Sequence, residues 1–119
     1  MKLTTRQIGA SSEATALKLL KRNGYKLLSR NYSTRGGELD LVVRKDASLV
    51  FVEVRYRSNI QFGTGAESVN WHKQQRLIRA AEHYLQHEVK DPDIYTEFRF
   101  DVVSIGEDVE WIQHAFTLD

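Results

Sequence analysis

Residues 37–55 read GELDLVVRKDASLVFVEVR, and this stretch decides the fold. Apolar residues alternate with other residues over positions 39–43, a polar segment follows at 45–48, and a second alternating run covers 49–57. Alternation with a period of two is typical of β-strands, and a short polar break between two such runs indicates a turn. The stretch therefore predicts two antiparallel strands joined as a β-hairpin.

The expected register of this hairpin places two acidic residues opposite each other. A turn centred on Asp46 and Ala47 pairs Asp40 with Glu53 across the two strands. Directly opposed residues have Cβ atoms about 4.5–5.5 Å apart, and two carboxylates at about 5 Å repel by roughly 3 kcal/mol at an effective dielectric constant of about 20. A divalent cation such as Mg²⁺ or Mn²⁺ between them reverses the sign of this interaction. Asp40 and Glu53 are therefore candidate metal ligands.

Arg55 extends this candidate site. Glu53 and Arg55 are separated by one residue, so their side chains project from the same face of the strand. The acids would hold the metal, the metal would activate a water molecule, and the cation would stabilise charge on an attacked phosphate, which suits hydrolysis of a phosphodiester bond. The alternative is an ordinary solvated strand face on which Glu53 pairs with Arg55 or Arg44, an interaction worth little.

A helix is expected before the hairpin, over residues 5–23. Its start carries a capping-box pattern at Thr4 and Gln7, in which side chains satisfy the free amides of the first turn. Glu13 lies four residues before Leu17 and therefore shares the inward, apolar face of this helix. An acid on such a face needs a partner or a function.

The remaining elements follow from the same analysis of hydrophobic periodicity. A second helix is expected from about residue 68 to 88, with an apolar stripe that begins at Trp71, and with Lys73 and Arg76 on the opposite face. Further strands are expected at 25–32, 98–105 and 110–116. The chain is thus predicted to be a single α/β domain over residues 1–119, with a mixed five-stranded sheet flanked by helices in the order α-β-β-β-α-β-β.

Asp101 stands between two apolar residues on the strand expected at 98–105. An acid in a core strand requires a compensating partner. We therefore expect Asp101 to pair with a basic residue and to play no part in catalysis.

Charge is distributed unevenly along the chain. Residues 1–57 contain 12 basic and 5 acidic side chains, whereas residues 58–119 contain 5 and 11, so a formal net charge of only +1 conceals a basic first half. A basic half can support a surface that binds phosphate groups. The alternative is that the two halves neutralise each other across the fold.

The composition also indicates a compartment. The chain has no cysteine, no apolar run approaching the roughly 18 residues of a membrane span, and no apolar secretory segment near its start. We therefore expect a cytoplasmic protein that does not cross a membrane.

Several motifs occur in a fixed order along the chain. They are Gly24-Tyr25, Arg30-Asn31-Tyr32, Gly37-Glu38-Leu39-Asp40-Leu41-Val42, Val50-Phe51-Val52-Glu53-Val54-Arg55, Glu67-Ser68-Val69 and Phe100-Asp101-Val102-Val103. In this combination the chain resembles the YraN-like family over nearly its whole length, and the two hairpin motifs are the most specific. The resemblance implies a restriction-endonuclease-like core, similar to that of the PD-(D/E)xK nucleases and the archaeal Holliday-junction resolvases.

The resemblance also implies roles for particular residues. In those nucleases an acid on the first helix, an acid on the second core strand and an E-x-K pattern on the third share one metal site, and the corresponding residues here are Glu13, Asp40, Glu53 and Arg55. The implied activity is that of a Mg²⁺- or Mn²⁺-dependent DNA endonuclease acting on branched DNA. Junction-cutting members of this fold work as pairs, so the resemblance also allows a homodimer.

Arg55 departs from the nuclease pattern, which has lysine at this position. A guanidinium group stays charged and cannot act as a general base, although it can neutralise a phosphate. The alternative to an active nuclease is therefore a catalytically degraded nucleic-acid-binding module of the same fold.

Four further residues are candidates near this site. Glu38 shares the strand face of the first hairpin acid, so it is either an outer metal ligand or a partner of Arg35 or Arg57. Arg57, Lys73 and Arg76 are candidates for contacts with a DNA backbone. The alternative for these three residues is an ordinary solvated surface.

Overall fold

The computed structural model describes residues 4–57 and 69–117. A five-stranded sheet forms its centre, and the strands lie in chain order, with all neighbours antiparallel except β3 and β4, which run parallel. The elements are α1 (Thr5–Arg22), β1 (Lys26–Ser33), β2 (Glu38–Lys45), β3 (Ser48–Tyr56), α2 (Trp71–His87), the short 3₁₀ helix η2 (Pro92–Ile94), β4 (Glu97–Ile105) and β5 (Val109–Phe116). The predicted α/β class, mixed sheet and element order are confirmed.

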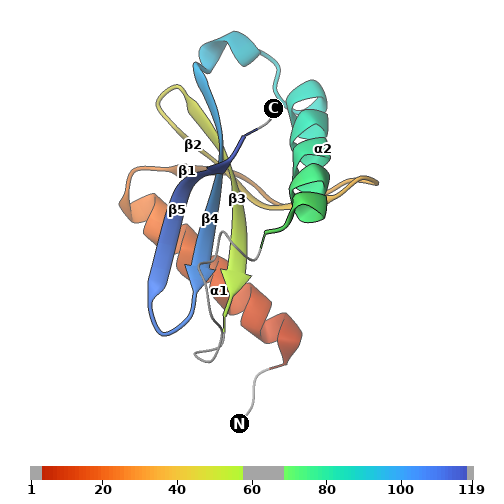
Figure 1. Cartoon of the computed structure of the whole chain (residues 1–119). Helices are drawn as coiled ribbons and strands as arrows, with labels where there is room; N and C mark the ends of the chain where they lie inside the picture. Colours follow the sequence, from red (N-terminus) through yellow and green to blue (C-terminus); the bar gives the residue numbers. More distant parts are fainter. Residues whose placement is uncertain (1–3, 58–68, 118–119) are drawn as a thin grey trace.

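The two long helices cover opposite faces of the sheet (Figure 1). Leu20 of α1 packs in the same cluster as Val50 and Val52, whereas Leu77 of α2 packs in the same cluster as Phe51. β3 is consequently buried on both faces, as is usual for a strand at the centre of a sheet that carries helices on both sides. A charged side chain on β3 is therefore surrounded largely by protein. Neither helix among the described residues is long and apolar enough to cross a membrane.

The β2–β3 hairpin keeps the predicted register as far as a defined point. The ladder of paired residues ends at Leu41 and Val52, so Asp40 and Glu53 lie one step beyond its last pair. The side-chain alternation of β2 breaks at the same place, since Leu39 packs in the cluster of α2 and Leu41 packs in the cluster of α1. The first residues of β2 thus stop pairing with β3 where the two acids lie, although Glu38 and Leu39 remain paired with β1.

Asp101 forms a buried ion pair with Arg99 within β4 and is also hydrogen-bonded to β5. Its side chain accepts hydrogen bonds from Arg99 Nε and from Trp111 Nε1, both at 2.8 Å, and Asp101 is only 1% exposed. Arg99 in turn donates to the hydroxyl of Tyr25 at 2.8 Å. This arrangement confirms the expectation that Asp101 pairs with a basic residue, and it links Tyr25, the residue before β1, to the two C-terminal strands.

Removal of the Asp101 carboxylate should destabilise the fold strongly. Asp101→Ala leaves the Arg99 guanidinium and the Trp111 indole N–H without their buried acceptor, so we expect the free energy of unfolding to fall by about 3–5 kcal/mol. Ser104→Ala is the matched control, because Ser104 is equally buried on β4 and its hydroxyl has no hydrogen-bond partner among the described residues. Urea unfolding followed by circular dichroism should show little change for this control. Equal effects of the two substitutions would contradict the assignment.

Candidate functional site

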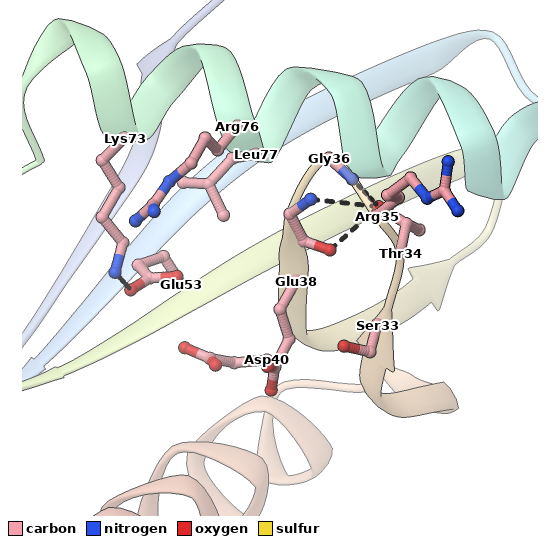
Figure 2. A pocket seen from close by; sticks show the side chains of 11 residues that line it. Ser33, Thr34, Arg35, Gly36, Glu38, Asp40, Glu53, Lys73, Arg76 and Leu77 are labelled. Atoms are coloured by element: carbon pink, nitrogen blue, oxygen red, sulfur yellow. Dashed lines mark hydrogen bonds and ion pairs between the residues drawn. The ribbon is translucent and has the colours of Figure 1, made fainter.

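A cavity of about 440 Å³ opens where β2 stops pairing with β3. The end of β1 at Ser33 and the loop of residues 34–37 form one side, and α2 forms another. Figure 2 shows the acids of β2 and β3 on the cavity wall, together with basic side chains that extend from α2. These walls contribute Glu38, Asp40, Glu53, Lys73 and Arg76. The cavity thus brings acidic and basic groups together from segments that lie far apart in the sequence.

Asp40 is held in place by the neighbouring strand. Its Oδ2 accepts a hydrogen bond from the backbone N–H of Val54 at 2.8 Å. The side chain therefore continues the link between β2 and β3 beyond the last residues that pair through their backbones, Leu41 and Val52. This bond fixes the Asp40 carboxylate next to Glu53, as the register predicts.

Glu53 is buried and has a lysine as its nearest cation. Its carboxylate is 6% exposed, and its Oε1 lies 2.9 Å from Nζ of Lys73 and 3.7 Å from Nη1 of Arg55. This burial rules out the solvated strand face that the sequence left open. Arg44 is directed elsewhere, since its Nε donates to the carbonyl of Asp46. Lys73, on α2, therefore provides the closer positive charge.

The negative charge of Glu53 disfavours ionisation of the neighbouring Asp40 carboxyl group. Burial and, after it, the charge of Glu53 raise the pKa of Asp40 from an ordinary value of 3.8 to about 7, against the lowering effects of the Val54 hydrogen bond and of Lys73. Two carboxyl groups that share a desolvated site cannot both ionise freely. Near neutral pH the pair consequently favours a bound proton or another cation. A divalent metal ion meets the same requirement, since Mg²⁺ prefers carboxylate oxygens.

Glu13 lies beside this pair and is engaged by other residues. Its Oε1 is 3.4 Å from Nε of Arg30, and the amide nitrogen of Asn31 donates to both carboxylate oxygens at 3.2 Å in the amide orientation that the surrounding atoms require. Burial and the charge of Asp40 raise the pKa of Glu13. Within residues 4–57 and 69–117, however, no three Asp, Glu or His side chains form a group that could hold a metal ion. Glu13 thus lies near Asp40 and Glu53 but does not form a three-ligand metal site with them.

The other predicted residues divide between the cavity and its surroundings. Glu38 is exposed at the start of β2 and lines the cavity. Arg57 does not line it, and its backbone N–H donates to the carbonyl of Ile105 at the end of β4. Lys73 and Arg76 border the buried face of α2 and line the cavity (Figure 2), so the prediction that they lie opposite the apolar stripe is wrong.

The loop of residues 34–37 is fixed against α2. A Cβ atom on Gly37 would lie 2.3 Å from the carbonyl oxygen of Arg76, so no side chain fits at this position. The hydroxyl of Thr34 accepts hydrogen bonds from the backbone N–H groups of Gly36 and Gly37, each at 3.1 Å. The cavity wall is therefore preorganised by close backbone packing. The sequence suggested only a turn or flexible loop here.

Comparisons with known proteins identify relatives over nearly the whole chain. The model of a family described as "Uncharacterised protein family UPF0102" matches residues 12–105. A UPF0102 protein of Cupriavidus pinatubonensis is 48% identical, covering 99% of this chain and 91% of the relative. A UPF0102 protein of Dechloromonas aromatica is 44% identical over 98% of this chain and 93% of its own, and one of Legionella pneumophila is 41% identical over 94% and 96%.

The raised pKa of Asp40 predicts a pH-dependent stability. Between about pH 4 and 7 the folded protein retains a proton that the unfolded chain releases, so this carboxyl group lowers the stability of the fold as the pH rises through that window. Asp40→Asn removes the repelling charge and keeps an oxygen for the Val54 N–H. We expect Asp40→Asn to be more stable than the wild type by about 2 kcal/mol at pH 8 and to lose this advantage below about pH 4.

Urea unfolding at a series of pH values measures this difference. Glu53→Gln serves as the control background, because without the Glu53 charge the Asp40→Asn substitution should gain less stability at pH 8. A destabilisation by Asp40→Asn of equal size at every pH would refute the electrostatic account of the pair.

Proposed function

We propose that this chain, which belongs to the uncharacterised protein family UPF0102, is a metal-dependent nuclease that hydrolyses phosphodiester bonds in DNA. The observation that carries the proposal is the pair of carboxyl groups of Asp40 and Glu53, held together at the edge of a cavity that also has basic walls. Ionising Asp40 beside Glu53 costs free energy, and this cost does not itself stabilise the fold. Perturbed carboxyl groups in a cleft are typical of functional sites.

The residues present suit a magnesium or manganese ion. Mg²⁺ is commonly bound by one or two carboxylates, with water and substrate phosphate oxygens completing its coordination, so a site with two protein ligands is sufficient. Asp40 and Glu53 would supply these ligands; Glu38 lines the same cavity and Glu13 is affected by the charge of Asp40, so these two acids are the candidates for contacts with the waters of the ion. When bound, such an ion activates water and stabilises negative charge on a phosphate.

The protein's own groups would position the substrate. Lys73 and Arg76 line the same cavity as the acids, so they can bind phosphate oxygens next to the reacting group. The Val54 amide keeps the Asp40 carboxylate oriented. Arg55 lies 3.7 Å from Glu53 and, as a guanidinium, contributes charge without accepting a proton.

Branched DNA is the substrate we favour, because the chain resembles nucleases that act on junctions. Two copies acting as a homodimer would place one site on each of two strands. A cytoplasmic location, where bacterial DNA lies, belongs to the same proposal. The basic first half of the chain supports the proposal that the partner is DNA, because it provides positive charge for a polyanion.

A catalytically degraded DNA-binding module is the second candidate. The observation that favours it is the contact between Lys73 and Glu53, because an ammonium at 2.9 Å already neutralises one of the two acids. Arg55 in place of lysine points in the same direction. This candidate predicts DNA binding that weakens steeply with salt and is accompanied by no cleavage.

Incubation of the purified protein with four-way junctions, flaps and plain duplexes tests the proposal. We expect cleavage that requires Mg²⁺ or Mn²⁺ and that Asp40→Asn and Glu53→Gln each slow by about 100-fold or more. Asp46→Asn is the matched control, since it makes the same change in the exposed hairpin turn, where a positive φ of 52° suits asparagine. Gel retardation without any cut product would favour the degraded module, and cleavage unaffected by both site variants would refute the assignment.

A further inference from the structure

We propose that Lys73 and a divalent cation compete for Glu53, and that the ammonium released by metal binding becomes a phosphate-binding group of the cavity. The inference rests on the proposed metal site and adds a residue that the E-x-K pattern does not contain. It assigns to α2 the lysine that β3 lacks at Arg55.

The contact between Lys73 and Glu53 is built into the start of α2. Asn70 caps this helix, and its Oδ1 accepts the backbone N–H of Lys73 at 2.9 Å. Leu77, one helical turn later, is buried against the sheet and prevents the helix from rotating. Lys73 is therefore fixed with its side chain toward β3, where Nζ reaches Glu53 Oε1 at 2.9 Å (Figure 2).

An ammonium group and a divalent cation on the same carboxylate of Glu53 repel each other. Like charges a few ångströms apart repel strongly in a site where burial reduces the screening by water. Glu53 is 6% exposed, so this repulsion is only partly relieved by solvent. Metal binding must therefore displace Nζ from the carboxylate. The Lys73 side chain is 28% exposed and unbranched, so it can move into the cavity without disturbing the core.

The displaced ammonium remains beside a second cation. Arg76 lies one turn after Lys73 on α2 and lines the same cavity. Lys73 and Arg76 would then face the strand of DNA from one side while the acids face it from the other. Before a metal ion is present, the positive charge of Lys73 beside Glu53 also reduces the repulsion between the two carboxyl groups.

Mn²⁺ titration by isothermal calorimetry tests the competition. We expect Lys73→Met to bind Mn²⁺ roughly 10-fold more tightly than the wild type, because the competing charge is gone, and yet to cleave DNA at least about 100-fold more slowly. Lys73→Arg keeps the charge and should bind Mn²⁺ within about 3-fold of the wild type. Arg76→Met is the matched control: it removes a cation from the same wall, but one without the contact to Glu53, and should change the affinity by less than about 2-fold.

The possible outcomes separate this inference from the proposed function. If the wild type binds Mn²⁺ and Lys73→Met binds it equally or less tightly, the competition is refuted while the nuclease proposal stands. If only Lys73→Met binds Mn²⁺, the competition is supported and the wild-type chain is not a metal-dependent nuclease. If neither protein binds Mn²⁺, both ideas fail. Tighter binding with unchanged cleavage refutes the phosphate-binding role, and Lys73→Gln repeats the measurement should the methionine variant unfold.

Discussion

The hydrogen bond from the Val54 amide to the Asp40 carboxylate is the constraint on which the cavity depends. Ordinary strand pairing ends at Leu41 and Val52, and beyond it a side chain takes over the link between β2 and β3. The backbone pairing of β2 and β3 can therefore end here while the Val54 amide keeps an acceptor, the loss of which would cost about 1–3 kcal/mol. The two acids lie just beyond the last pair and line the cavity, so this one contact joins the two strands and also fixes an acid of the site.

The rest of the fold makes it costly for Asp40 and Glu53 to be negatively charged at the same time. Helices on both faces of the sheet enclose β3, so Glu53 has little water to screen its charge. The same burial raises the pKa of Asp40 to about 7. An apolar pair at these positions would pack without such a cost, and proteins that bury ionic groups without compensation lose stability. This electrostatic cost falls on Asp40 and Glu53, and both residues line the cavity.

Much of this arrangement could be predicted from the sequence, because its causes are local. The turn at Asp46 and Ala47 sets the register, and the register brings Asp40 to Glu53. Contacts made by distant segments could not be predicted in the same way. Helical periodicity placed Trp71 on the apolar stripe, although it is 64% exposed at the first residue of α2. The same analysis placed Lys73 on the outer face, because a helical wheel gives relative directions around the axis and does not locate the sheet.

The position of Lys73 shows how a site can keep its charges while its motif changes. Arg55 lies 3.7 Å from Glu53 and Lys73 lies 2.9 Å away, so the carboxylate is flanked by one cation from its own strand and one from a helix that follows it in the chain. A guanidinium two residues after the acid is bulky, planar and permanently charged, whereas the ammonium on α2 is compact and mobile. Under the proposed function, the lysine on α2 would supply the movable charge that the arginine on β3 does not. In the mechanism we propose, Glu53 needs a movable positive charge within reach, and the packing of α2 on the sheet brings Lys73 to that position.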